Sequence, residues 1–121
     1  MVKALFDTNI LIDYLNGIEQ AKDELALYEG RAISIITWME VMVGAAGDLA
    51  AVTRAFLSGF EILAVDEAVA ERAVAIRQAR RVKLPDAIIR ASAEVHGLLL
   101  VSRNDKDFPP DDPGVRMPYR I

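Results

Sequence analysis

The sequence predicts a single α/β domain over residues 1–121, with a central, mostly parallel sheet of four to five strands flanked by helices. Short apolar runs such as residues 2–6 lack polar alternation, which is typical of strands buried on both faces. Segments with apolar residues at helical spacing alternate with these runs, as they do in parallel-sheet folds. A chain of 121 residues is also long enough to bury a core of its own.

The first half of the chain divides into strands and helices at polar and glycine positions. The expected elements are a strand at 2–6, helices at 8–15 and 18–28, a strand at 32–36, and helices at 37–46 and 48–58. Asp7 stands at the first strand-to-helix junction, where its carboxylate is suited to cap the helix. Thr37 is expected to cap the third helix, which places Glu40 in the first turn of that helix.

The second half continues the same alternation. The expected elements are a strand at 60–65, helices at 66–81 and 83–96, a strand at 98–102 and a short strand at 115–119. Asp66 is expected to cap the first of these two helices. Pro85 fits the first turn of the second, and Gly97 fits the position just past its end. Pro118 suits an edge strand, where a missing N–H does no harm.

Composition narrows the classes of function. The net charge is −4 and the pI about 4.9, so any phosphate partner must be held locally rather than by bulk positive charge. The chain has no cysteine, which excludes disulfides, thiolate catalysis and cysteine-bound zinc. No apolar run is long enough to span a membrane, and Asp7 and Asp13 interrupt any signal-peptide core. We expect a soluble, cytoplasmic protein.

Five acids follow the predicted strands. Asp7 follows the first strand, Glu40 lies in the helix after the second, and Asp86 opens a helix. Asp105 and Asp107 come after the fourth strand. Because the carboxyl ends of parallel strands meet at one edge of a sheet, where open α/β sheets bind ligands, we expect these acids to converge.

Several ionised carboxylates that share a small volume need a counter-charge. With oxygen ligands, no cysteine and one histidine, Mg²⁺ is the expected cofactor, and Mn²⁺ can replace it. A cation held by carboxylates can activate water and stabilise a leaving oxygen, which is the chemistry of phosphodiester hydrolysis. Simpler interpretations stay open at this point: Asp7 as a plain helix cap and Asp86 as a partner of the helix dipole. Glu40 also fits a surface position of its helix, and Asp105 and Asp107 fit an ordinary solvated loop.

The stretches "FDTNILIDYL", "TWMEVMVGA" and "KLPDAIIRASAEVHGLLLVSRNDKDF", in this order, resemble the PIN domain. They are most similar to the small single-domain ribonuclease toxins of VapC type, and the resemblance covers essentially the whole chain. It implies that Asp7, Glu40 and Asp86 match the first three metal-binding acids of the family, which are also its catalytic residues.

The fourth acid is where this chain departs from the family pattern. Relatives with the sequence "TRD" have an acid where this chain has Asn104. Asp105 or Asp107 could supply the charge instead. Both are therefore candidate metal ligands, and Asp105 is also a candidate catalytic residue. The departure leaves open whether one or two metal ions bind.

The resemblance also implies supporting residues around the acids. Asn9, Thr37 and Ser102 match polar positions that support the site in relatives, and Asn104 is expected to join them. Charge patterning suggests a rim of cations for RNA phosphates, formed by Arg103, Lys106, Lys83 and the pair Arg80 and Arg81. The alternative is that most of these cations are ordinary solvated surface.

The leading hypothesis is a Mg²⁺-dependent endoribonuclease that acts as the toxin of a type II toxin–antitoxin pair. Residues 25–28 and 38–43 carry more apolar side chains than one core contact requires, and surplus apolar surface often marks an interface. The residues alone allow both stretches to be sandwiched in the core instead. The resemblance implies a homodimer that is held inactive by an antitoxin peptide in a groove between helices.

Two rival functions fit parts of the sequence. One is an inactive PIN-like module that binds RNA or protein, because an acid is missing at Asn104. The other is an aspartyl-phosphate phosphatase of haloacid-dehalogenase type, which also begins with a strand followed by an acid-x-acid motif. Here the third position of that motif is Asn9, and no cap domain is evident, which disfavours the phosphatase.

Overall fold

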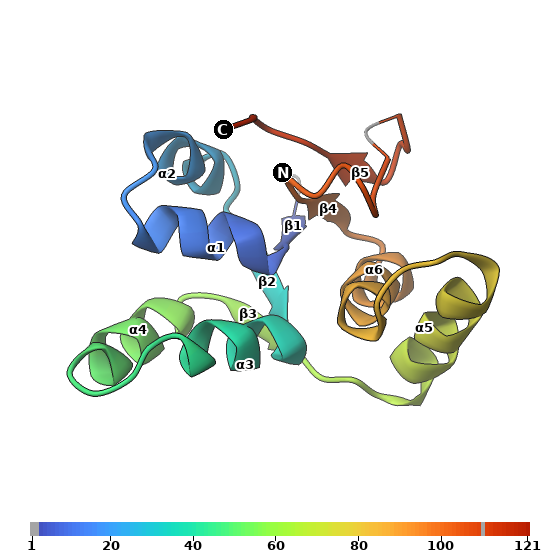
Figure 1. The fold of residues 1–121 in the computed structure, drawn as a ribbon, viewed down its shortest axis with the longest axis horizontal. Helices are drawn as coiled ribbons and strands as arrows, with labels where there is room; N and C mark the ends of the chain where they lie inside the picture. The colour runs from blue at the N-terminus through green and yellow to red at the C-terminus, as the bar shows by residue number, and fades with distance from the viewer. Residues whose placement is uncertain (1–2, 110) are drawn as a thin grey trace.

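The structure is a computed structural model that describes residues 3–109 and 111–121, and it is built on a five-stranded parallel sheet (Figure 1). The strands are β1 (Lys3–Phe6), β2 (Gly30–Ser34), β3 (Glu61–Leu63), β4 (Leu99–Val101) and β5 (Val115–Arg116). Their order across the sheet is β3-β2-β1-β4-β5, with β1 at the centre. The expected fold class is confirmed, and the carboxyl ends of the strands lie at one edge.

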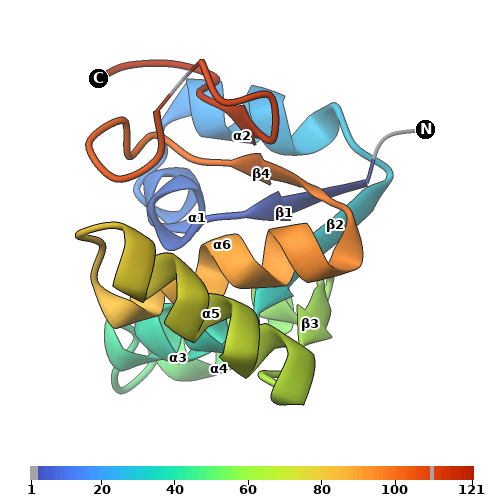
Figure 2. The same cartoon turned by 90° about the vertical axis from the view of Figure 1, so that its right-hand side faces the viewer.

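Within the described residues, six helices connect the strands. They are α1 (Thr8–Leu15), α2 (Glu19–Ala26), α3 (Ile35–Val43), α4 (Leu49–Leu57), α5 (Glu67–Ala79) and α6 (Leu84–His96). Figure 2 shows α5 and α6 lying side by side in front of the sheet, whereas α1 lies behind it. None of these six helices has the length and apolar character needed to cross a membrane.

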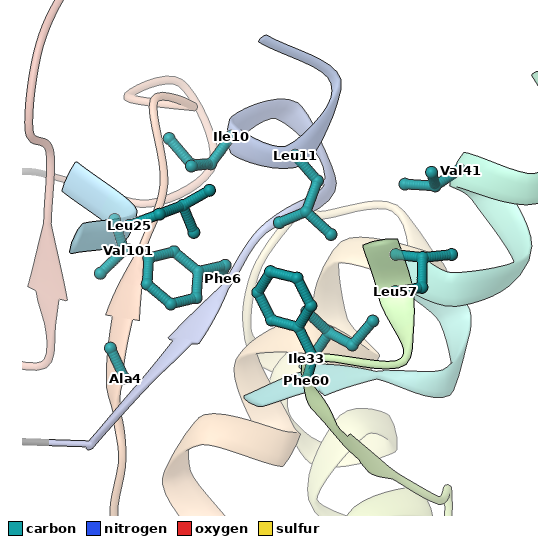
Figure 3. Close-up of a cluster of buried hydrophobic side chains, with 10 residues drawn as sticks. All are labelled: Ala4, Phe6, Ile10, Leu11, Leu25, Ile33, Val41, Leu57, Phe60 and Val101. Carbon is teal, nitrogen blue, oxygen red and sulfur yellow. The ribbon is translucent and has the colours of Figure 1, made fainter. Parts of the chain in front are cut away.

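Both faces of the sheet are buried, and β1 shows how. Ala4 and Phe6 point into one cluster of apolar side chains, to which α1 and α2 contribute (Figure 3). Leu5, between them, packs on the opposite face with Ile89 and Ala93 of α6. Successive side chains of a strand point to opposite faces, so a strand that is covered on both sides needs a continuous apolar run.

Helices α5 and α6 form a packed pair that fixes the start of α6. Val69 and Ala73 of α5 are buried against Ala87 and Ala91 of α6. The small alanine side chains allow the two helices to approach closely. This packing holds the first turn of α6, and with it Asp86, at the carboxyl edge of the sheet.

Several local predictions are confirmed. Helix α1 has the expected bounds. Asp66 caps α5 by accepting a hydrogen bond from the N–H of Val69 at 2.9 Å. Pro85 lies in the first turn of α6, and Gly97 ends that helix in the left-handed conformation, at φ +64°.

The predicted boundary between β2 and α3 is wrong. Strand β2 ends at Ser34, whereas the sequence predicts a strand through Ile36. The Ser34 hydroxyl accepts a hydrogen bond from the N–H of Ile36 at 3.1 Å, so Ser34 caps α3 in place of Thr37. The β-branched isoleucines favour a strand, but this serine cap outweighs their preference. Thr37 is therefore buried inside α3, and Glu40 lies in its second turn rather than its first.

Other boundaries differ by smaller amounts. Elements α2, α5, β3 and β4 lie inside their expected bounds, and α3 ends before Ala46. Arg80 becomes the residue just after α5 instead of its last turn. Strand β5 is an edge strand, but it ends at Arg116, so Pro118 falls outside it. Val2, the first residue of the first expected strand, lies outside the described residues.

Candidate active site

Asp7 stands at the carboxyl end of β1, caps α1 and is only 3% exposed. Its Oδ1 accepts a hydrogen bond from the N–H of Thr8 at 2.7 Å. Its Oδ2 accepts one from the Ser102 hydroxyl at 2.7 Å and one from the side-chain N–H of Asn9 at 3.3 Å. A carboxylate has about four acceptor positions, so these three contacts fix its orientation and leave about one position for a cation.

The negative charge of Asp7 is costly in this position. Burial is the largest influence on the pKa of Asp7 and raises it, because a buried carboxylate loses its hydration. Hydrogen bonds from Ser102 and Thr8 lower the pKa in part, whereas the nearby charge of Glu40 raises it again. The net effect is that the pKa of Asp7 is raised above its ordinary value. A cation at the remaining acceptor position would relieve this cost.

Asp86 brings the acids of different elements together. It lies in the first turn of α6, half-buried, and its pKa is raised to about 6. Burial is the largest cause, followed by the charges of Asp7 and Asp107, a hydrogen bond shared with the Asp107 carboxyl, and the charge of Glu40. These four acids come after four different strands, β1 to β4, and they meet at one edge of the sheet because the strands are parallel.

Glu40 is exposed on α3 and is tied to this edge through Thr8. The Thr8 hydroxyl donates a hydrogen bond to Oε1 of Glu40 at 2.6 Å and lies 3.0 Å from the hydroxyl of the buried Thr37. Thr37 thus contacts the site indirectly, from inside α3. Thr8 is absent from the residues expected from sequence. A hydroxyl residue directly after an acid at a helix start is the signal that would have identified it.

The segment after β4 distinguishes the three candidates for the fourth position. Asn104 and Asp107 are joined by two hydrogen bonds, from Asn104 Nδ2 to Asp107 Oδ2 at 3.0 Å and from the N–H of Asp107 to Asn104 Oδ1 at 3.2 Å. The N–H of Asn104 also donates to the Ser102 hydroxyl at 3.0 Å. Asp105 instead forms an exposed ion pair with Arg120 at 2.6 Å. Asp107 therefore faces Asp86, whereas Asp105 is turned away.

The donors at this edge suit a hard divalent cation, because they are carboxylate, hydroxyl and amide oxygens. Across residues 3–109 and 111–121, no three acidic or histidine side chains are close enough to form a ready-made metal site. The acids are near enough to raise the pKa of Asp86 but not near enough to share one ion as they stand. A cation that binds all of these acids would have to draw them closer together.

The cations expected at the rim divide into two groups. Arg103 is not free, because its guanidinium forms two hydrogen bonds with Asp13, at 2.6 and 2.9 Å. Lys83, just before α6, and Lys106, in the loop after β4, are both exposed. Arg80 and Arg81 are exposed as well. Lys83 and Lys106 lie close in sequence to Asp86 and Asp107, so they are the cations best placed to meet a phosphate backbone at this edge.

An apolar groove of about 360 Å³ lies between α1, α3 and α4 and reaches the acid edge. Its lining includes Ile12 and Leu15 of α1, and Leu49 and Val52 of α4. All four side chains are strongly exposed, with Val52 at 63%. Glu40 lines the same groove. An occupant of this groove would therefore lie beside one of the four acids.

The two apolar stretches expected to be interfaces are only partly exposed. In residues 38–43, Val41 is buried and Trp38 packs on the core, whereas Val43 is 84% exposed. In residues 25–28, Leu25 is buried and Leu27 is exposed. The surplus apolar surface is thus confined to one side of each stretch, and the other side belongs to the core.

The chain is similar over most of its length to known proteins of one family. The family model described as the PIN domain matches residues 4–109. The tRNA(fMet)-specific endonuclease VapC of Shigella flexneri is 32% identical to this chain over 120 residues, which cover 89% of this chain and 91% of that protein.

Two solved structures share the fold. A toxin–antitoxin complex from Klebsiella pneumoniae contains a chain that is 52% identical, with a TM-score of 0.93, and the match covers 98% of this chain and 100% of that chain. A DNA-bound VapBC complex from Salmonella typhimurium contains a chain that is 33% identical, with a TM-score of 0.77 and 96% of each chain covered.

Proposed function

Because this chain belongs to the PIN-domain family, we propose that it is a metal-dependent endoribonuclease, a VapC-type toxin that hydrolyses RNA phosphodiester bonds. The observation that carries the proposal is the environment of Asp86. Its pKa is raised to about 6, first by burial and then by acids from three other segments of the chain. A fold that gathers four acids at a ligand-binding edge needs a cation there, and phosphodiester hydrolysis is the reaction such a cation serves.

We assign the cation to Asp7, Asp86, Asp107 and Glu40, with Mg²⁺ as the resident ion and Mn²⁺ as its substitute. A divalent ion bound there would supply positive charge for the reacting phosphate and would make water more acidic. Asp7 contributes a carboxylate that three hydrogen bonds hold in one orientation. Asp107 takes the place of the acid that is missing at Asn104, because the Asn104 side chain holds it in position.

RNA is the proposed substrate. Lys83, shortly before Asp86, and Lys106, directly before Asp107, are exposed and would hold the phosphate backbone. Asp86 must be ionised to bind the cation, so the site is expected to work above about pH 6. Transfer RNA is the first substrate to test, since the Shigella relative is named for one.

We also propose that an antitoxin controls the enzyme. Its apolar helix would occupy the groove between α1, α3 and α4, where Leu49 and Val52 are exposed. Because Glu40 lines that groove, a bound antitoxin would lie against the acid site. The antitoxin partner is supported by solved relatives that are toxin–antitoxin complexes. We further propose that the enzyme acts as a homodimer in the cytoplasm.

The proposal is tested by RNA cleavage and cation binding measured on the same proteins. Purified parent protein should cleave transfer RNA with Mg²⁺ or Mn²⁺ and stop when the metal is chelated. Asp7→Asn and Asp86→Asn should abolish both cleavage and Mn²⁺ binding by calorimetry. Asp23→Asn, an exposed acid of α2, is the matched control and should change neither. Cleavage that persists in Asp7→Asn would contradict the assignment.

A further inference from the structure

Arg103 and Tyr119 form a polar cluster around the buried carboxylate of Asp13. Asp13 lies in α1 and is only 4% exposed. Arg103 donates to it twice, from Nε to Oδ2 at 2.6 Å and from Nη2 to Oδ1 at 2.9 Å. The Tyr119 hydroxyl donates to the same Oδ2 at 2.8 Å. We call these three residues the C-terminal latch, because Tyr119 comes from the last residues of the chain (Figure 1).

The backbone of Arg103 is part of the hydrogen-bond network around Asp7. Its N–H donates to Oδ1 of Asn9 at 3.2 Å, and Nδ2 of Asn9 in turn faces Asp7 and Ser102. The residues on either side of Arg103 also take part. Ser102 donates to Asp7, and the N–H of Asn104 donates to Ser102. The contacts that fix Arg103 against α1 therefore also help to maintain the hydrogen bonds that Asn9 and Ser102 donate to Asp7.

We propose that the C-terminal latch positions Asp7 for the cation, and that Arg103 is a positioning residue rather than an RNA contact. This inference rests on the proposed metal site. The guanidinium of Arg103 joins residues 102–104 to α1 through its two hydrogen bonds with Asp13. The Tyr119 hydroxyl donates a third hydrogen bond to the Asp13 carboxylate. The segments joined in this way are the ones that carry Asn9 and Ser102, which orient the Asp7 carboxylate.

A bidentate arginine suits this task. The two parallel N–H···O bonds between Arg103 and Asp13 fix both distance and angle, which a single lysine contact would not do. Asp13 keeps its charge because Arg103 and Tyr119 stabilise it, and the pKa of Asp13 is lowered despite burial. Nε and Nη2 of Arg103 therefore both donate to a buried carboxylate, and these two donors are not offered to an RNA phosphate.

The chain contains a second cluster with the same chemistry, and this provides a matched control. Arg116 donates twice to the buried Glu24, at 2.6 and 2.9 Å, and the Tyr28 hydroxyl donates to Glu24 at 2.9 Å. This cluster joins β5 to α2, and among the described residues its side chains form no hydrogen bond with the four acids. Only the backbone carbonyl of Arg116, which the substitution to glutamine keeps, accepts from the N–H of Ser102 at 3.0 Å. Removing either arginine leaves a buried carboxylate without its ion pair, so both losses should destabilise the fold to a similar extent.

The test compares Arg103→Gln with Arg116→Gln, and Tyr119→Phe with Tyr28→Phe. Mn²⁺ affinity is measured by calorimetry at pH 7, and exchange of the Thr8 and Asn104 amides is followed by NMR without metal. We expect Arg103→Gln to weaken Mn²⁺ binding about tenfold, the range for residues that orient a metal ligand. Tyr119→Phe should weaken it by a smaller factor. Both variants should speed exchange at the two amides, whereas the Arg116 and Tyr28 variants should leave affinity and exchange unchanged.

The other possible outcomes distinguish a failure of the C-terminal latch from a failure of the metal site. Equal losses of affinity in the Arg116 and Arg103 variants would mean a general stability effect and would overturn the inference. An Arg103→Gln protein with normal Mn²⁺ affinity but weak RNA binding would return Arg103 to the RNA rim. If the parent binds no Mn²⁺, the metal site fails, and the amide exchange alone decides the latch. If Arg103→Gln does not fold, the milder tyrosine pair decides.

Discussion

The Ser102 hydroxyl donates a hydrogen bond to the Asp7 carboxylate at 2.7 Å, although the two residues are 95 positions apart in the chain. The contact follows from sheet register. Phe6 pairs with Val101 in neighbouring parallel strands, and the N–H of Asp7 donates to the carbonyl of Val101 at 2.9 Å. The residues that follow Phe6 and Val101 therefore emerge together. The site is built by two adjacent strands ending at the same level.

Replacing Asp7 by asparagine should raise the stability of the fold while it abolishes function. The pKa of Asp7 is raised mainly by burial, so the folded protein carries an unfavourable charge at this position. Asp7→Asn removes the charge and keeps a side-chain oxygen that can accept from the N–H of Thr8. We expect the free energy of unfolding to rise by about 1 kcal/mol, or about 4 °C in melting temperature. Thermal unfolding without metal checks this.

The same variant should bind no Mn²⁺, so it would be more stable and inactive. The exposed Asp23→Asn change should leave the melting temperature within about 1 °C, since surface substitutions are usually neutral. A lower melting temperature for Asp7→Asn would mean that its three hydrogen bonds matter more than the cost of burying its charge.

Cation binding should increase as pH rises through about 6. The pKa of Asp86 is raised to about 6, so at pH 5 its carboxylate is mostly protonated and a cation must displace the proton. We expect Mn²⁺ affinity to be about tenfold weaker at pH 5 than at pH 7, with little further change above pH 7. Calorimetry at three pH values measures this. An affinity that is flat from pH 5 to 7 would contradict the raised pKa.

Stability of the metal-free protein should show the opposite pH dependence. A carboxyl group whose pKa is higher in the folded state than in the unfolded state binds more protons when folded. For Asp86 this holds between its ordinary value of 3.8 and about 6, so its contribution to the free energy of unfolding falls as pH rises through that window. Comparing the pH dependence of melting for the parent and Asp86→Asn isolates this contribution.

Asp107 and Asp105 should behave differently although they are two positions apart. Asp107→Asn removes a like charge and a hydrogen-bond partner of Asp86, so the midpoint of the pH dependence should move below 6. Its Mn²⁺ affinity should fall about tenfold. Asp105→Asn breaks only an exposed ion pair with Arg120 and should cost at most about 1 kcal/mol, with affinity unchanged. Equal effects of the two substitutions would restore Asp105 as a ligand.

The fold and three of the four acids are predictable because they depend on local pattern. Buried strands have continuous apolar runs, Asp66 and Gly97 mark helix ends, and parallel strands place Asp7 and Asp86 at the same edge. The β2–α3 boundary is less predictable, because isoleucines with strand preference follow the serine that caps the helix. A cap is a single hydrogen bond that propensity does not reveal.

The choice of Asp107 as the fourth acid and the role proposed for Arg103 depend on contacts that no local pattern contains. Asp105 and Asp107 share a loop without periodicity, and only the hydrogen bonds of Asn104 distinguish them. Arg103 lies 90 positions along the chain from its partner Asp13, and Tyr119 lies 106 positions from Asp13. From the sequence, Arg103 is an ordinary cation beside the acids. An acid such as Asp13 within an otherwise apolar helix was the available signal that it has a buried partner.

A charged side chain in the groove between α1, α3 and α4 should weaken binding of the antitoxin. Val52 is 63% exposed on α4 and lines the groove with Leu49. Val52→Glu should leave the melting temperature nearly unchanged, since glutamate is a good helix former and the side chain already meets water. It should weaken binding of the antitoxin, taken as the small protein encoded beside this chain, roughly 30-fold, because the charge would be buried against an apolar helix.

The matched control is Val74→Glu, which places the same charge at a 51% exposed position on α5, outside the groove. Affinity measured by calorimetry should be unchanged for this variant. Equal losses in the two variants would point to net charge rather than to the groove. Normal affinity in both would place the antitoxin elsewhere, and Glu40 would then no longer lie beside it. Restored binding of Val52→Glu by a compensating lysine on the antitoxin helix would identify the contact directly.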